Sequence, residues 1–293
     1  MIQRASGWLP TLVALAVVVL WGASPVVTKL ATAELDPLLI GLGRTLLGGL
    51  IALPLAAVLR SAPPPRRLLL PFALSAFGGF IAFPVLFSFG QRLTSAMHGG
   101  LILAALPIFT GLYAAAVERR APSGRWWLGC AVAFAGEIVL IGARAAGGGT
   151  ASSLAGDLLV LAAALFGSLG YVAGARLAQA GYASLGATLW GIMAASLVVA
   201  PGLTIASGGA LPVASWVAWA ALGYLALVVS ILGYVGWYWS LGRGGIARMG
   251  TIQFLQPLSG LALAFLLLGE RPTATLAIAT VLILAGVVIA RRR

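Results

Sequence analysis

Long apolar runs alternate with short polar or basic segments along the whole chain. Within a run such as Thr11 to Leu20 the apolar residues are continuous, without the alternation expected of a membrane barrel strand, so the pattern predicts helices. A membrane-spanning helix needs about 20 mainly apolar residues. The runs of about this length are 8–28, 37–59, 68–90, 95–117, 126–142, 154–175, 183–205, 213–239, 246–268 and 273–290. The sequence therefore predicts an all-α integral membrane protein with ten transmembrane helices.

The basic residues give these predicted helices a direction. Only 8% of the 293 residues are charged, against about 25% in soluble domains, so the net charge of +12 does not indicate a nucleic-acid partner. Of the 18 basic residues, thirteen lie in segments on the side of the N-terminus, four lie on the opposite side, and Arg44 falls within a helix. Because basic loops stay in the cytoplasm, both termini are predicted to be cytoplasmic.

The two halves of the chain resemble each other. The segment 142–153 is rich in Gly, Ala and Ser, as flexible linkers are, and it divides the predicted helices into five and five. A shift of 150 residues places Pro107 on Pro257, Pro122 on Pro272 and Gly136 on Gly286. Coincidence in so apolar a sequence is the alternative. Because five is odd, two repeats at 1–143 and 154–293, joined by a linker at 144–153, would cross the membrane in opposite directions, as in many transporters.

Short motifs punctuate the predicted helices. They are Trp21-Gly22 and Lys29 in the first helix, Pro107 and Glu118 in the fourth, Pro257 in the ninth, and Leu268-Gly269-Glu270-Arg271-Pro272 after it. With these motifs the chain resembles the EamA-type branch of the drug/metabolite transporter superfamily over nearly its whole length, and within it the aromatic and neutral amino-acid exporters. Val117-Glu118 departs from the pattern because it lacks the glycine. The resemblance implies a bacterial inner-membrane exporter of small metabolites, often amino acids.

Residues for enzyme chemistry are sparse. The chain has one histidine, His98, and six acidic residues that are scattered over loops and helix regions. A metal site needs clustered ligands and general acid–base catalysis needs groups close together. A Gly-rich phosphate loop with lysine does not occur either, so ATP-driven pumping has no support. We therefore expect no enzyme activity, no cofactor and no metal.

Two ionisable residues fall inside predicted helices, where charges are rare and mark function or pairing. Arg44 and Glu137 lie at about the same depth, roughly 10 Å below the outer surface by helix rise, which predicts an ion pair. A proton-coupling Glu137, or two separate side chains that reach toward the lipid surface, are the alternatives. Lys29 is a membrane-surface anchor or a ligand for a substrate carboxylate. His98 is a helix-end polar residue or a proton carrier.

Polar and aromatic side chains at mid-depth suggest a central cavity. Gln253 and Gln256 share one face of the ninth helix, where they would bind substrate or bond to other helices. Prolines free backbone groups, which are tolerated at membrane depth where they line a cavity or are buried in protein. The predicted helix breaks are at Pro25, Pro84, Pro107 and Pro257. The candidate cavity residues are Trp21, Ser24, Phe80, Phe83, Phe87, His98, Tyr171, Tyr234, Trp237, Gln253 and Gln256.

Some of the aromatic candidates have an alternative role to cavity lining. The stripe of Phe80, Phe83 and Phe87 fits plain helix packing as well as cavity lining. For Trp237, with its neighbours Tyr238 and Trp239, a belt at the membrane interface is the favoured role.

Together these features predict a transporter that works by alternating access. Helices one, three, four, six, eight and nine are expected to line the cavity, with the short fifth and tenth helices at the periphery. The expected partners are a small-molecule substrate and the lipid bilayer, with no nucleic acid, and the chain would be a monomer or homodimer. A drug or organic-cation exporter of the same fold, a non-transporting scaffold or receptor, and a lipid-modifying enzyme are the alternatives.

Overall fold

The structure is a computed structural model that describes residues 8–119, 123–147, 153–207, 212–271 and 273–291. All regular elements within these residues are helical, which confirms the all-α prediction. Seven helical stretches of the described residues are long and apolar enough to cross a membrane, and Gln256–Leu268 and Ala274–Gly286 are shorter apolar helices. The seven are Leu9–Glu34, Pro37–Val58, Arg66–Leu93, Ala96–Val117, Leu154–Gln179, Ser184–Thr204 and Trp216–Gly244.

In the first half of the chain, three of the predicted runs are divided into shorter helices. The elements are α1 (Leu9–Gly22), α2 (Ser24–Glu34), α3 (Pro37–Val58), the 3-10 helix η1 (Arg66–Leu68), α4 (Leu69–Ala76), the π-helix η2 (Phe77–Ala82), α5 (Phe83–Leu93), α6 (Ala96–Ile102), the 3-10 helix η3 (Leu103–Ala105), α7 (Leu106–Glu118) and α8 (Gly124–Gly147).

The second half is divided at its third and fourth predicted helices, as the first half is, but its first helix is whole. Its elements are α9 (Leu154–Gln179), α10 (Ser184–Ser207), α11 (Trp216–Tyr224), the π-helix η4 (Leu225–Gly233), α12 (Tyr234–Gly244), α13 (Ile246–Gly250), the 3-10 helix η5 (Thr251–Leu255), α14 (Gln256–Leu268) and α15 (Ala274–Arg291).

Each predicted helix break coincides with an irregular turn. Pro25, Pro84, Pro107 and Pro257 are each the second residue of a helix, namely α2, α5, α7 and α14. A proline cannot donate a hydrogen bond to the turn before it, so it is tolerated where a helix starts. The preceding turn is a break at Ala23, the π-helix η2, or a 3-10 turn in η3 and η5. The sequence does not signal η4, which contains no proline.

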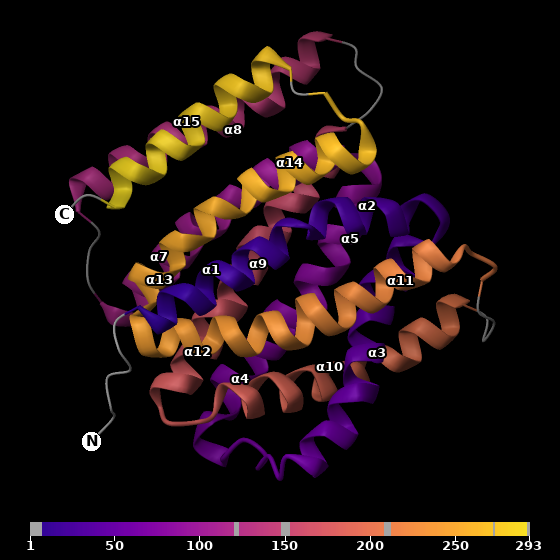
Figure 1. The fold of residues 1–293 in the computed structure, drawn as a ribbon. Coiled ribbons are helices and arrows are strands. Elements are labelled where there is room, and N and C mark those ends of the chain that lie inside the picture. The colour runs from indigo at the N-terminus through magenta and orange to yellow at the C-terminus, as the bar shows by residue number, and fades with distance from the viewer. Residues whose placement is uncertain (1–7, 120–122, 148–152, 208–211, 272, 292–293) are drawn as a thin grey trace.

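Two helix pairs lie outside a packed centre. The pair α8 and α15 runs side by side along one edge of the molecule, and α3 packs on α10 at the opposite side (Figure 1). Small residues let α8 and α15 approach closely. A Cβ at Gly286 would lie 2.4 Å from both the oxygen of Gly129 and the nitrogen of Ala133, which leaves no space for a larger side chain.

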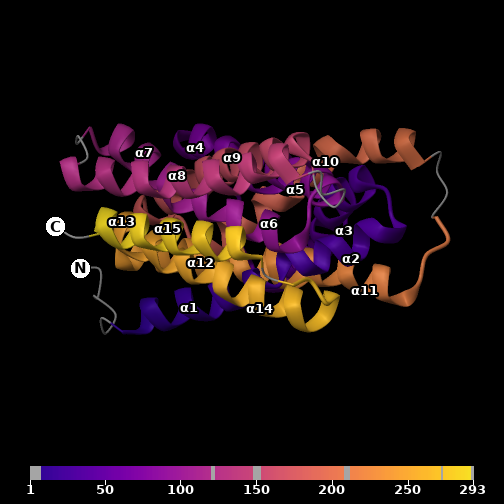
Figure 2. The same ribbon diagram turned by 90° about the horizontal axis from the view of Figure 1, so that it is seen from above.

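The central helices pack in matching ways in the two halves. In the first half, α1 packs on α12 and α14 of the second half; in the second half, α9 packs on α5 and α7 of the first. In the view turned by 90°, the start of α1 and the end of α15 lie at the same end of the bundle (Figure 2). The terminal residues themselves, and residues 148–152 of the predicted linker at 144–153, lie outside the described residues.

Candidate functional site

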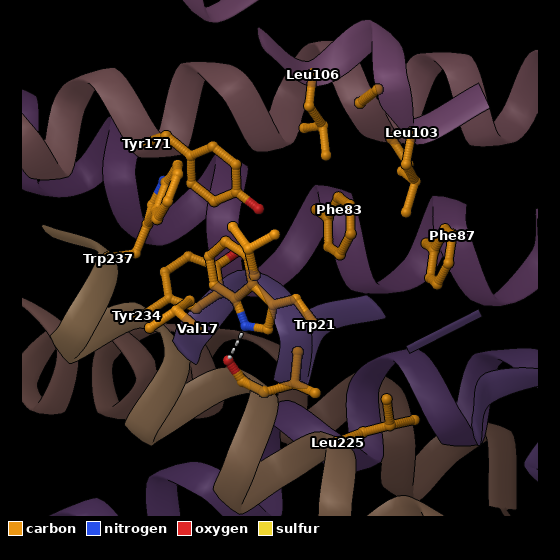
Figure 3. Packing of buried hydrophobic residues seen from close by; sticks show 14 of the residues in the cluster. Val17, Trp21, Phe83, Phe87, Leu103, Leu106, Tyr171, Leu225, Tyr234 and Trp237 are labelled. Carbon is orange, nitrogen blue, oxygen red and sulfur yellow. Dashed lines mark hydrogen bonds between the residues drawn. The ribbon is translucent and has the colours of Figure 1, made fainter. Parts of the chain in front are cut away.

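Aromatic rings from four distant parts of the chain meet at the centre of the bundle (Figure 3). Trp21 stacks on Tyr171, with ring centroids 5.3 Å apart and planes at 13°. Tyr234 and Trp237 lie 5.4 and 5.5 Å from Trp21, and Phe80 lies 4.7 Å from Tyr234. The rings come from α1, η2, α9 and α12, so both halves of the chain contribute.

The π-helical stretches provide hydrogen-bond acceptors for these rings. The indole Nε1 of Trp21 donates to the backbone oxygen of Val229 in η4 at 3.0 Å, as the dashed line in Figure 3 marks. The hydroxyl of Tyr234 donates to the backbone oxygen of Gly79 in η2 at 3.0 Å. Wide turns of this kind leave carbonyls free of their usual helical partners, and they occur frequently at functional sites.

The two glutamines of the ninth predicted helix join the rings. Gln256 donates to the backbone oxygen of Trp21 at 3.4 Å, and Gln253 donates to Gln256 at the same distance. The side chain of Gln253 also lies close to that of Tyr171. These rings and the two glutamines together form the central cluster of seven residues. They are Trp21, Phe80, Tyr171, Tyr234, Trp237, Gln253 and Gln256.

The central cluster is closed. The exposed fractions of its side chains range from 0 to 5%. Around the bundle, α6 packs on α14 and α7 packs on α13. Within this tight packing, the side-chain oxygen of Gln253 and the indole nitrogen of Trp237 have no hydrogen-bond partner among the described residues. Such unpaired buried groups are rare, so each calls for an explanation.

Trp237 and Tyr238 are not part of an interfacial belt, so that prediction is wrong for them. Both are 0% exposed, and Tyr238 shares a hydrogen bond of 2.8 Å with Ser75. Trp239 is half-buried, with the Arg243 guanidinium 5.7 Å from its ring centroid. Four aromatic residues within six positions must point to different sides of a helix, and the sequence does not say which side faces the bundle.

Phe83 and Phe87 form a stack apart from the central cluster. Their ring centroids are 5.3 Å apart with planes at 11°, and they lie beside Leu103 and Leu106 (Figure 3). The hydroxyl of Ser24 is buried without a partner among the described residues.

Arg44 lies at the edge of the central cluster. It is 1% exposed, and its Nε and Nη2 donate to the hydroxyl of Ser230 in η4 at 3.2 and 2.9 Å. The side chains of Tyr234 and Tyr171 lie in the neighbourhood of the guanidinium. The side chain of Glu137 in α8 lies outside the described residues, so the predicted ion pair stays a prediction.

Lys29 fastens the end of one helix to another. Its ammonium donates to the backbone oxygens of Gln91, in the last turn of α5, and Thr94, its C-cap residue, at 3.0 and 2.7 Å. Beside it, a pocket of about 310 Å³ opens at this end of the bundle. Lys29, Leu30, Thr32, Ala33, Arg92 and Leu268 line the pocket.

The same end holds further polar contacts that sequence reasoning missed. Both carboxylate oxygens of Glu270 accept from the first amides of α6, those of Ala96 and Met97, at 2.9 and 2.8 Å. His98 shares a hydrogen bond of 2.8 Å with Ser95. The Gly-Glu stretch of the sequence marked Glu270, but nothing in the sequence pointed to a partner 174 residues away.

A family model described as the EamA-like transporter family matches residues 8–142 and, a second time, residues 154–292. The chain belongs to the EamA-like transporter family. This confirms the resemblance drawn from the motifs, and it makes the chain a transporter rather than an enzyme. Membership together with the apolar helices identifies a multi-pass membrane protein of the kind found in bacteria.

Relatives of this EamA-like chain carry more specific names. It is 32% identical over 295 residues to a probable amino-acid metabolite efflux pump of Salmonella typhimurium, with 98% of this chain and 95% of that protein covered. It is 25% identical to the aromatic amino acid exporter YddG of Ancylobacter novellus, with 96% of each covered. A solved crystal structure superposes with a TM-score of 0.69 over 96% of each chain at 23% identity, which shows a shared fold.

Proposed function

We propose that this protein exports small amphipathic metabolites, amino acids including aromatic and neutral ones, by alternating access through the central cluster. The observation that carries the proposal is the composition of that cluster. It combines aromatic rings with two amides in the middle of the bundle, where a polar group is costly unless it is paired or functional. Relatives named as an amino-acid metabolite efflux pump and an aromatic amino acid exporter support the same substrate class.

The architecture proposed for this function is ten transmembrane helices in two inverted repeats, 1–143 and 154–293, with both termini in the cytoplasm. The double match of the family model supports it. So does the matching packing of α1 on the second half and α9 on the first. A site built from both repeats can be opened to one side and then to the other when the repeats exchange conformations.

The closed cluster then corresponds to a state between the two openings. Irregular turns next to Pro25, Pro84, Pro107 and Pro257 interrupt the helices around the cluster. Such turns bend more easily than regular helix, because fewer backbone hydrogen bonds hold them. Bending at these turns would separate the rings while the helix ends stay packed.

Counterflow in proteoliposomes tests the proposal. Vesicles with purified protein are loaded with one unlabelled amino acid, and uptake of its radiolabelled form is followed. Uptake above that of protein-free vesicles, reduced in the Trp21→Ala variant, is expected for amino acids with aromatic or neutral side chains. Counterflow of a lipophilic quaternary ammonium without counterflow of any amino acid would instead favour the organic-cation alternative, for which aromatic rings are also suited.

A further inference from the structure

Arg44 carries a full charge without a counter-charge in the part of the chain that the structure describes. Its guanidinium has five N–H donors, of which those on Nε and Nη2 reach the neutral hydroxyl of Ser230. Its Nη1 is buried and has no partner there. A buried charge is strongly unfavourable unless it is paired and hydrogen-bonded. The guanidinium is therefore half satisfied, and what it lacks is an anion.

The arginine is held in place rather than free to swing toward the membrane surface. Ser230, its acceptor, donates in turn to the backbone oxygen of Leu225 at 2.8 Å, within η4. The next residue of α3, Thr45, donates to the backbone oxygen of Phe80 in η2 at 2.5 Å. Both π-helical stretches thus fix the turn of α3 that carries Arg44. This rigidity excludes a side chain that reaches to the lipid headgroups.

The guanidinium of Arg44, with its unpaired Nη1, lies next to the central cluster. Val229, which accepts the hydrogen bond of Trp21, directly precedes Ser230. Thr45, the residue that follows Arg44, donates a hydrogen bond to the backbone oxygen of Phe80, which is a member of the central cluster. Glu137 is carried by α8, which packs on α15 at the edge of the molecule opposite to α3 and α10 (Figure 1). The groups that surround Arg44 are therefore those of the central cluster.

We propose that Arg44 binds the carboxylate of the transported substrate. Arginine is suited to this role because its planar donors match the two oxygens of a carboxylate. The aromatic rings would then hold the apolar body, and the unpaired oxygen of Gln253 would accept from a substrate ammonium group. The inference rests on the proposed function and narrows it, since an amine or a quaternary ammonium without a carboxylate would be excluded.

Binding to the purified full-length protein in detergent tests the inference. Calorimetric titrations compare three probes of similar shape: phenylalanine, phenylalaninamide, which lacks the carboxylate, and 3-phenylpropanoate, which lacks the ammonium. We expect the wild-type protein to bind both carboxylates and to bind the amide at least tenfold more weakly. In Arg44→Gln, binding of the carboxylates should weaken about ten- to a hundredfold, the range for charge-assisted hydrogen bonds. Arg44→Lys should retain part of the preference.

The control is Arg176→Gln, which removes an exposed arginine of α9 and should leave all three affinities unchanged. If Arg44→Gln does not fold, the wild-type comparison of phenylalanine with phenylalaninamide still decides. Equal affinity for the two, or binding of neither carboxylate, overturns the inference while leaving export open. Binding that depends on Arg44 without counterflow of any amino acid would overturn the proposed export instead.

Discussion

Tyr171 is positioned where α9 crosses η2. The substitution Gly170→Ala tests how closely the two helix backbones approach each other at this crossing. A Cβ at Gly170 would lie 2.7 Å from the backbone nitrogen of Gly79 and 3.2 Å from the carbonyl carbon of Gly78. Ordinary contact begins at 3.4 Å, so the two backbones must separate by about 0.7 Å (3.4 − 2.7). Overpacking of this kind costs about 1–3 kcal/mol.

Gly223→Ala is the matched control. Gly223 is a helical glycine of α11 whose added Cβ would meet nothing within 4 Å. Both substitutions gain the helix propensity of alanine, about 1 kcal/mol, so the difference between the variants isolates the collision at Gly170. Because Tyr171 follows Gly170, the stack on Trp21 should also loosen and counterflow should fall.

Thermal unfolding in detergent and counterflow in proteoliposomes measure the two effects. We expect Gly170→Ala to unfold at a lower temperature than the wild-type protein and Gly223→Ala to unfold at the same or a higher temperature. Equal midpoints for both variants, with normal counterflow, would refute the close crossing of α9 and η2.

Three further outcomes follow from the structure. Gln253→Leu and Gln256→Leu should each reduce counterflow at least severalfold while the protein still folds; normal transport in both would mean that the amides only pack. Glu270→Gln replaces one of the two carboxylate oxygens that accept from the first amides of α6 with an amide NH2 group, and it should lower the free energy of unfolding by about 1–3 kcal/mol. An unchanged unfolding midpoint would contradict the contact between Glu270 and α6. A reporter that is active only in the cytoplasm, fused after Arg293, should be active; a silent reporter with normal expression contradicts the proposed topology.

The helix breaks could be read from the sequence because their cause is local. A proline removes one donor and collides with the preceding turn whatever surrounds it, and Pro84 and Pro257 stand at irregular turns in the structure. The π-helical stretch η4 has no such local cause. Its unusual turn is matched by contacts with Trp21 and Arg44, which are about two hundred residues away in the chain.

The surroundings of Arg44 show a second limit of sequence reasoning. Helix rise gives the depth of a residue in the membrane, and on that basis Arg44 and Glu137 are predicted to pair, which stays a prediction because the Glu137 side chain lies outside the described residues. Equal depth says nothing of the direction in which a side chain points or of which helices are neighbours. The structure places Ser230 against Arg44, and a single serine in an apolar run gives no signal in the sequence that would have found it.

The polar side chains at the centre of the bundle pair with backbone carbonyls of the irregular turns. Irregular turns expose backbone carbonyls, and each unpaired carbonyl in an apolar surrounding is costly. Side chains from other helices pair with them: Trp21 with Val229, Tyr234 with Gly79, Thr45 with Phe80, Ser168 with Leu106 and Gln256 with Trp21. In the proposed alternating-access cycle these bonds hold the closed state, and a substrate with its own polar groups replaces them as the helices part. Because hydrogen bonds are then exchanged rather than lost, the closed and open states can lie close in free energy, which a transporter that cycles between them requires.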